Sequence, residues 1–485
     1  MVVSIVVDQL RSDYLHYFSP TFGERGFKRL MNEGLVYYSV DFGYPHRSEA
    51  ASIASIYTGA YPSENGITGD TKYDFATNRV VSIVADDNYL GNYTSDRVSP
   101  KALMASTVGD ELTLATQGKS QVIAIAPNAA EAIISGGRNA TYALWLDDYN
   151  GQWATSTYYK DIPNCIDRYN FTQAPANVPE KIWQQSLSYY NGFPYTKQTY
   201  PFLHKFSKSP QADYRRFKQS ALINTEITDL AMYVIEQEPA RTIETPNFLA
   251  ITYYAGNYKE GKESEEYSYE VQDTYYRLDK ELGRLFDCLE RRVGLAQVLI
   301  ILTSTGYYDA LPSSFANAGA NEFYPERCKA LLNMYLIAMY GQGNWVAAYH
   351  DRQIYLDKKL AESKDIHWKE LVKNASDFVA QFSGVQSCWS REDIPNANGV
   401  NKKISGDLFL ELQSGWVEMD AQNKTKDYSR NNAILSPLFI WSNHLKHEQV
   451  SRPIKATEIA PTISSILRIK SPDASKEIPL YEIFK

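Results

Sequence analysis

The 485-residue sequence lacks any run of about 18 apolar residues, and its first residues already form the pattern of a buried strand. We therefore expect neither a membrane-spanning helix nor a signal peptide. Histidine is scarce, with seven in the chain, and the four cysteines lack CxxC or CxxH spacing. A cysteine metal site and a disulfide framework are therefore not expected.

An excess of positive charge is also lacking. The chain has 49 Lys and Arg against 57 Asp and Glu, a formal net charge of −8, whereas a nucleic-acid-binding protein carries a basic face. We exclude nucleic acid as a partner. Hydrophobic residues make up 44% of the chain, enough for a sizeable core. The 37 tyrosines exceed what a core needs, so we expect aromatic side chains to line a groove.

Short, almost continuous apolar runs recur along the chain, a pattern typical of strands that are buried on both faces of a parallel sheet. They are Val2 to Val7, Gln121 to Ala126, Phe248 to Tyr254, Val298 to Thr303, Met334 to Met339 and Leu438 to Trp441. Helical patterns at 26–34 and 269–294 lie between them. This alternation predicts an α/β fold with a doubly wound, mostly parallel sheet that is flanked by helices.

Two regions interrupt the alternation. Residues 150–240 are rich in Tyr, Pro, Gln and Asn, and residues 345–425 mix helical and turn signals. Strands resume after each region, so we interpret both as insertions on a single domain that spans residues 1–485. The first insertion is predicted to cover a cleft.

Several motifs occur in order. VVSIVVDQLRSDYL places Asp8 directly after the first strand, and ASIYTGAYPSENGITGDTKYD, YSYEVQDTYYRLD, LNMYLIAMYGQGNWV, RQIYLDKKL and RPIKATEIAPTISSIL follow. Together they resemble the alkaline phosphatase superfamily over nearly the whole chain, specifically its bacterial phosphate-monoesterase branch, which is related to nucleotide pyrophosphatase/phosphodiesterases. The resemblance implies two zinc ions held by Asp and His side chains, and a Thr or Ser nucleophile at a helix N-terminus.

The positions for the nucleophile and for phosphate binding are substituted. Glu49 stands where the family has its nucleophilic Thr. The preceding residue, Ser48, is interpreted as the N-cap of the helix. Asp70 replaces an Asn, while Asn128 and Ala130 replace the Lys and Arg of a K-D-R element. Glu49 is interpreted as a carboxylate favoured by the helix dipole. The alternative is a carboxylate nucleophile that forms an acyl phosphate, which needs a metal beside it.

The metal positions are substituted as well, and a single retained carboxylate cannot hold zinc. Asp8 is retained, whereas the other ligand positions are occupied by Tyr253, Asn257, Thr305, Gly306 and Lys426. No histidine stands at a matched position. His46 lies near the former nucleophile, and His444 and His447 have a spacing that suits a surface metal, although solvated histidines are the commoner case.

These substitutions predict a pseudoenzyme without cofactor that acts as a binding or scaffolding protein in the cell envelope. Its partner is a protein segment or a cleft ligand, bound by Asp8, Glu49, Asp70, Tyr253, Asn257 and Lys426. In this hypothesis Lys426 or a nearby Arg pairs with Asp8 or Glu49. The alternative is a phosphate monoester or diester hydrolase with a displaced or single-metal zinc site. A third hypothesis is a structural subunit of an envelope assembly. The resemblance implies a periplasmic or otherwise exported protein.

Overall fold

The computed structural model describes residues 1–45, 48–177, 180–186, 202–207, 214–237, 245–258, 268–309, 321–420, 425–429 and 434–485. The chain divides into two compact units. The first comprises residues 1–70, 83–308 and 434–485, and the second comprises residues 71–82 and 309–433.

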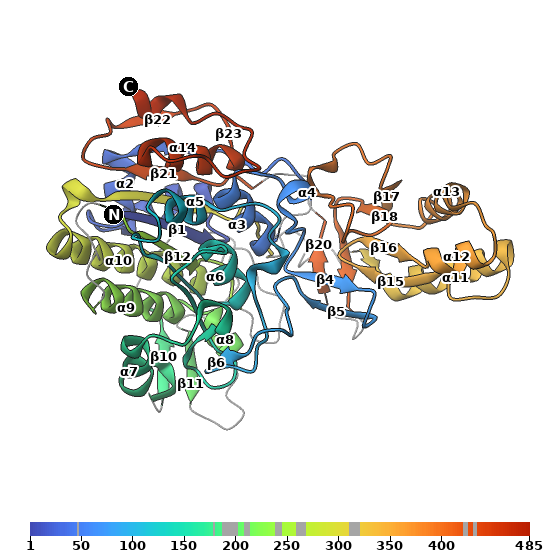
Figure 1. The fold of residues 1–485 in the computed structure, drawn as a ribbon, viewed down its shortest axis with the longest axis horizontal. Coiled ribbons are helices and arrows are strands. Elements are labelled where there is room, and N and C mark those ends of the chain that lie inside the picture. The colour runs from blue at the N-terminus through green and yellow to red at the C-terminus, as the bar shows by residue number, and fades with distance from the viewer. Residues whose placement is uncertain are drawn as a thin grey trace. The chain divides into compact units, whose positions relative to one another are not determined.

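The first unit is built on a central sheet flanked by helices (Figure 1). The sheet has ten strands in the order β22-β2-β21-β13-β1-β12-β7-β8-β9-β6. Its central strands are β1 (Val2–Asp8), β7 (Val122–Ala126), β12 (Phe248–Tyr254) and β13 (Leu299–Ser304), and all of their residues are buried. They pair in parallel, with β1 between β12 and β13. The apolar runs become strands here because both faces of the sheet are covered.

Antiparallel pairs occur on both sides of the centre. β8 continues the parallel set beside β7, but β9 pairs antiparallel with β8, and β21 pairs antiparallel with β13 and β2. The outer strands are β2 (Leu35–Tyr37), β6 (Gly91–Asn92), β8 (Tyr142–Leu146), β9 (Trp153–Ser156), β21 (Leu438–Trp441) and β22 (Glu448–Val450). The predicted fold class is confirmed.

Helices flank the sheet. Helix α3 packs on α6, and α9 packs on both α10 and β12. The long helix α10 is amphipathic, and the Ser268 side chain caps its first turn by accepting from the Val271 amide. The helices of this unit are α1 (Ser12–Phe18), α2 (Phe27–Glu33), α3 (Glu49–Thr58), α4 (Pro62–Asn65), α5 (Val108–Ala115), α6 (Ala129–Gly136), α7 (Asn164–Thr172), α8 (Tyr214–Lys218), α9 (Leu222–Gln237), α10 (Tyr269–Arg292) and α14 (Ile459–Leu467).

Residues 150–240, predicted to be an insertion, contribute β9 and helices α7 to α9 to the first unit. They also form the antiparallel pair of β10 (Glu180–Gln184) and β11 (Leu203–Ser207). A short parallel pair, β3 (Val40–Asp41) and β23 (Ile454–Lys455), completes the strands described for this unit. That residues 150–240 cover the cleft stays a prediction.

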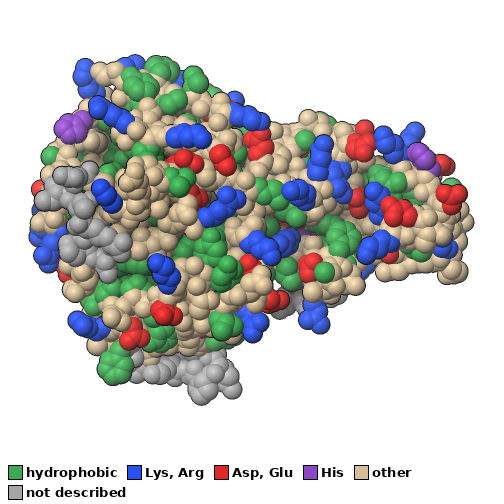
Figure 2. Space-filling model, in the orientation of Figure 1, with side chains coloured by type: hydrophobic (Ala, Val, Ile, Leu, Met, Phe, Trp, Pro, Cys, Tyr) green, Lys and Arg blue, Asp and Glu red, His purple; other side chains and the backbone are tan. Residues whose placement is uncertain are grey.

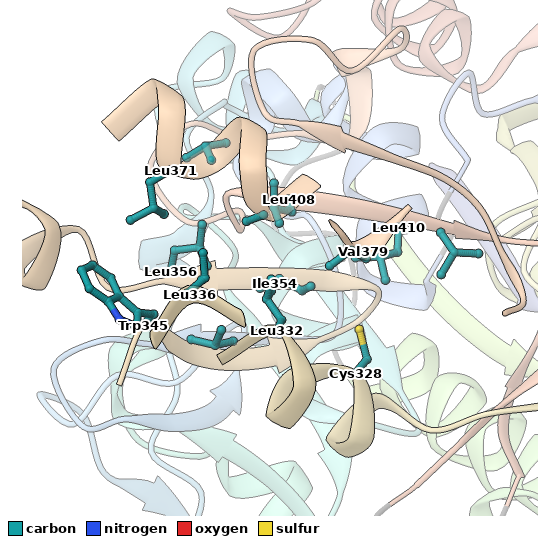
Figure 3. Close-up of a cluster of buried hydrophobic side chains, with 14 of the residues drawn as sticks. Cys328, Leu332, Leu336, Trp345, Ile354, Leu356, Leu371, Val379, Leu408 and Leu410 are labelled. Atoms are coloured by element: carbon teal, nitrogen blue, oxygen red, sulfur yellow. The ribbon is translucent and has the colours of Figure 1, made fainter. Parts of the chain in front are cut away.

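The second unit contains the predicted insertion 345–425. A four-stranded antiparallel sheet, β15-β16-β18-β17, packs with helices α11 and α13 around buried side chains that include Leu332, Ile354 and Leu371 (Figure 3). Its elements are β4 (Thr71–Asp74), β5 (Arg79–Ser82), β14 (Asn321–Phe323), α11 (Pro325–Tyr340), β15 (Val346–His350), β16 (Gln353–Leu356), α12 (Lys358–Ser363), α13 (Trp368–Val379), β17 (Val385–Ser390), β18 (Leu408–Leu412), β19 (Trp416–Met419) and β20 (Thr425–Tyr428).

One predicted strand is wrong. Met334 to Met339 belong to helix α11. Leu332 and Leu336, four residues apart, are fully buried, whereas Met334 is 64% and Met339 53% exposed. Burial therefore follows the helical period, and an apolar run of six residues does not by itself distinguish a strand from part of a helix.

Charged side chains of both signs lie on the surface, as the similar numbers of basic and acidic residues lead us to expect. Figure 2 shows Lys and Arg side chains interspersed with Asp and Glu side chains over the visible face. Among the helices in the described ranges, none combines the length and the apolar content that a membrane crossing requires.

Candidate functional site

The candidate site begins at the carboxyl end of the central strands, the edge where open α/β sheets bind ligands. Asp8 ends β1, and its Oδ1 accepts a hydrogen bond of 2.6 Å from the Thr305 hydroxyl, just beyond β13. The next residue, Gln9, has a left-handed backbone (φ 62°), and its amide donates to the same hydroxyl at 3.2 Å. The structure thus brings together two predicted site residues, Asp8 and Thr305.

The N-terminus of α3 supplies two further carboxyl groups. Glu49 is the first residue of the helix, and the Ser48 side chain caps it by accepting from the Ala51 amide at 3.3 Å. Asp70 reaches the same end, where its Oδ1 accepts from the Ala50 amide at 2.8 Å. Both acids therefore lie where the helix dipole favours negative charge.

Glu131, which the sequence interpretation missed, lies opposite Glu49. It is the third residue of α6 and 3% exposed, and its Oε1 accepts a 2.5 Å hydrogen bond from Asn128 Nδ2. The carboxyl group of Glu49 interacts with those of Glu131 and Asp8. Carboxyl groups this close in a buried site favour a state in which one of them keeps its proton.

The pKa values agree with a shared proton. Burial raises the pKa of Glu49 well above its usual range, and the charges of Glu131 and Asp70 raise it further. Burial raises the pKa of Glu131 to about 7. The interactions with Glu49 and Asn128 and the charge of Lys218 oppose this rise, and the charge of Asp8 adds to it. Because the two carboxyl groups interact, the protonation belongs to the pair.

Lys218, at the end of α8, is the second residue that motif matching missed. It is 6% exposed, and its Nζ donates to Asp148 Oδ1 at 2.5 Å and to Asn128 Oδ1 at 3.3 Å. The family's K-D-R element has its Lys at position 128. An ammonium group thus reaches the same place from a helix 90 residues later in the chain, which no local motif reveals.

Replacement of Lys218 by methionine is expected to lower the free energy of unfolding by about 2 kcal/mol, because it leaves the partly buried Asp148 without its cation. It should also raise the pKa of Glu131, since Lys218 lowers it. Denaturant unfolding across pH measures both effects. Lys205→Met, which removes an exposed pair with Glu180, serves as the control and should cost under about 0.5 kcal/mol. Equal losses for the two variants would contradict this role.

Two other predicted site residues lie on or after β12. Tyr253 pairs with Val7, so its side chain points to the opposite sheet face from Asp8. Its hydroxyl lies 2.9 Å from that of Thr228 on α9, and burial raises its pKa. Asn257 is fully buried, and neither polar atom of its side chain has a hydrogen-bond partner among the described residues.

Gly306 leaves no room for a side chain. Its φ is +65°, and a Cβ atom there would lie 2.5 Å from Cε2 of Phe42 and 2.6 Å from Cδ2. Phe42 is itself fully buried. The space that a histidine ligand would need at this position is therefore taken by an aromatic ring.

The remaining predicted residues add no described polar group to the candidate site. Ala130 is the second residue of α6 and offers no polar group. Lys426 belongs to β20 in the second unit, and its side chain lies outside the described residues, so its pairing with Asp8 or Glu49 stays a prediction. His46 also lies outside the described residues.

The donor set does not fit a pair of zinc ions. At the matched positions, the Asp8 carboxylate is hydrogen-bonded to Thr305, Tyr253 presents a buried phenol on the other sheet face, and Gly306 presents no ligand. Within the described ranges, no three His, Cys, Asp or Glu side chains are grouped to hold a metal ion. His447, predicted as part of a possible surface site, places its Nδ1 2.8 Å from the Gly34 carbonyl oxygen.

The central parallel strands and a site at the N-terminus of α3 define an α/β protein of the alkaline phosphatase type. A family model described as type I phosphodiesterase / nucleotide pyrophosphatase matches residues 2–434. Alkaline phosphatase PafA of Elizabethkingia meningoseptica is 30% identical, with 100% of this chain and 94% of that protein covered. A protein named calcium-transporting ATPase from Myroides odoratus is 29% identical, with coverages of 99% and 94%.

The fold agrees with these matches. The crystal structure of wild-type PafA superposes with a TM-score of 0.83 at 26% identity and covers 100% of this chain and 98% of its own. The chain belongs to the type I phosphodiesterase / nucleotide pyrophosphatase family, within the alkaline phosphatase superfamily. The resemblance to the bacterial phosphate-monoesterase branch is thereby confirmed.

Proposed function

We propose that this chain is a binding or scaffolding protein built on a phosphatase fold. The observation that carries the proposal is the Glu49–Glu131 carboxyl pair, which occupies the helix end where the family places its nucleophile. When one carboxyl group of the pair keeps its proton, it can donate a hydrogen bond to the other. The pair needs neither metal ion nor phosphate to compensate its burial.

Charge supports the proposal. Asp8, Glu49, Asp70 and Glu131 surround the place where a phosphate ester would react, while Lys218 is already paired with Asp148. A phosphate dianion would meet the charges of Asp8 and Asp70 there. Lys218 takes the place of the family's Lys but is already paired with Asp148, and Ala130 offers no donor in place of the Arg. A neutral or cationic group of a partner would suit this surface better.

The second candidate is a phosphate monoester or diester hydrolase. The comparisons favour it, because the names of the relatives describe a phosphatase and an ATPase. This candidate requires a displaced or single-metal site near Asp8 and Glu49, completed by Asp70 or His46. Glu49 would then attack phosphorus and displace the alcohol of the ester, which leaves an acyl phosphate for water to hydrolyse.

The partner is proposed to be a protein segment or a small ligand that contacts Asp8, Glu49 and Asp70, with Asn257 as a further contact. An exported location is part of the same proposal and rests on the resemblance to the phosphatase branch. A subunit of an envelope assembly remains compatible with it.

A turnover assay separates the two candidates. We expect the purified protein, with zinc added, to hydrolyse a chromogenic phosphate monoester and diester at the background rate, and Glu49→Ala to leave that rate unchanged. Turnover that scales with protein concentration and is lost in Glu49→Ala would support the hydrolase. Glu111→Gln, which replaces a buried carboxylate outside the Glu49 pair, controls for general loss of structure.

A further inference from the structure

The second unit holds two of the four cysteines, Cys328 on α11 and Cys388 on β17. Cys328 is 1% exposed, Cys388 is half-buried, and both thiols are free in the structure. They lie 60 residues apart in the chain, without a spacing that marks them as a pair. Their places in the fold are what relate them.

Cys328 faces the apolar core of the second unit. Together with Leu332 and Leu336 it forms the buried stripe of α11, at intervals of four residues. Figure 3 shows its sulfur directed from α11 toward the layer that holds Val379 and Leu410, which belong to the same core cluster. This thiol therefore ends between the helix and the sheet.

Cys388 reaches the same layer from the edge strand β17. It stands directly opposite Leu410 of β18, and opposite residues of an antiparallel pair project to one face of the sheet. Cys388 also packs against the core cluster that contains both Cys328 and Leu410. Ser376 of α13 donates to the Cys388 carbonyl oxygen at 2.8 Å, which holds the strand beside that helix. The two thiols thus point into one apolar layer.

The two sulfur atoms also interact electrostatically. Burial raises the pKa of each thiol to about 12, and the charge of Cys388 raises the pKa of Cys328 further. Such an interaction requires that the sulfur atoms lie close together. Easily reduced disulfides are those whose reduced form is stabilised as a thiolate, and neither cysteine here offers that stabilisation. The surroundings therefore favour the oxidised form of the pair.

We propose that Cys328 and Cys388 form a disulfide that locks α11 to β17 when the protein is in an oxidising compartment. The loop that this bond closes contains strands β15 and β16 and helices α12 and α13. A covalent link across a loop of this length restricts the unfolded chain and so disfavours unfolding. The inference agrees with an exported location and does not depend on whether the candidate site binds a partner or hydrolyses phosphate esters.

The bond forms by thiol–disulfide exchange with an organic disulfide such as glutathione disulfide. Cys388, the more exposed thiol, attacks as a thiolate one sulfur of the donor, which breaks the donor S–S bond and leaves a mixed disulfide. The Cys328 thiolate then attacks the Cys388 sulfur and displaces the second half of the donor. The two cysteines are oxidised, the donor is reduced to two thiols, and these take up the two protons that the cysteines lose.

Peptide mapping of the whole protein tests the proposal. The reduced protein is equilibrated with glutathione and excess glutathione disulfide, in urea below the unfolding transition, so that local opening exposes the thiols. After digestion with trypsin without reductant, we expect the peptide with Cys328 to be joined to the peptide with Cys388 in most chains. Cys165→Ser, which changes a half-buried cysteine of the first unit, should leave this link intact. Cys388→Ser should abolish it.

Unfolding in urea provides a second measurement that needs no variant. The oxidised wild type should have an equilibrium constant for unfolding about a thousandfold lower than the reduced wild type, as chain entropy predicts for a loop of this length. A Cys328 that stays a thiol, that keeps only glutathione, or that joins Cys165 or Cys288 would overturn the proposal. So would a link between Cys328 and Cys388 that leaves the unfolding constant unchanged, because the bond would then strain the native fold.

Discussion

Replacing Gly306 by alanine is expected to lower the free energy of unfolding by about 3 kcal/mol. Part of the loss is the cost of a side chain at φ +65°, about 1–2 kcal/mol. The remainder is overpacking against Phe42, whose Cε2 atom would lie 2.5 Å from the new Cβ, and overpacking costs about 1–3 kcal/mol. Equilibrium unfolding in denaturant gives the difference.

Gly118 provides a matched control. It also has a positive φ, +76°, but a Cβ there would meet nothing within 4 Å, so Gly118→Ala should lose only the backbone part. In a Phe42→Ala background the extra cost at Gly306 should largely disappear. Equal losses for the two glycines would show that Phe42 does not fill the ligand position. If the expected difference is found, no single substitution can restore the family's histidine without strain.

Replacing Glu131 by glutamine is expected to stabilise the protein by about 3 kcal/mol at pH 8 and by little at pH 4. The pKa of Glu131 rises from 4.5 to about 7 on folding, so the folded state holds more protons than the unfolded state in this interval. The free energy of unfolding contributed by this group therefore falls as pH rises from about 4.5 to about 7, at roughly 1.4 kcal/mol per pH unit. Glutamine removes that loss and can still accept from Asn128.

Glu111→Gln is the control for this experiment. Glu111 is also buried, in the first turn of α5, and accepts a 2.7 Å hydrogen bond from the Ser106 hydroxyl. It lies outside the carboxyl pair, so its replacement should not stabilise the protein selectively at pH 8. A Glu131→Gln effect of the same size at pH 4 and pH 8 would mean that folding does not raise the pKa of Glu131.

Much of the fold could be predicted because buried strands leave a strong local signal. Four central strands fall within about a residue of the predicted runs, since both of their faces are covered and most of their positions are apolar. The run Met334 to Met339 was wrongly predicted as a strand because it is short and lies within a longer helix. Its helical nature shows only when Leu332 and Leu336 are read with it.

The site was predictable only in part. Asp8 and Glu49 each adjoin the end of an element within a recognisable motif, so the sequence places them. Glu131 had a local signal, since it follows the substituted K-D-R element as the third residue of a helix, but its partner lies 82 residues earlier. Lys218 and Phe42 carried no motif at all. Their roles arise from packing between segments distant in sequence, which local patterns do not encode.

Zinc content of the folded protein tests the central claim most directly. After equilibration with excess zinc and removal of free metal by gel filtration, elemental analysis should find well below one zinc per chain, because the matched positions offer one hydrogen-bonded carboxylate, a turned-away phenol and a glycine. Two tightly held zinc ions per chain, lost together in Asp8→Ala, would contradict the account.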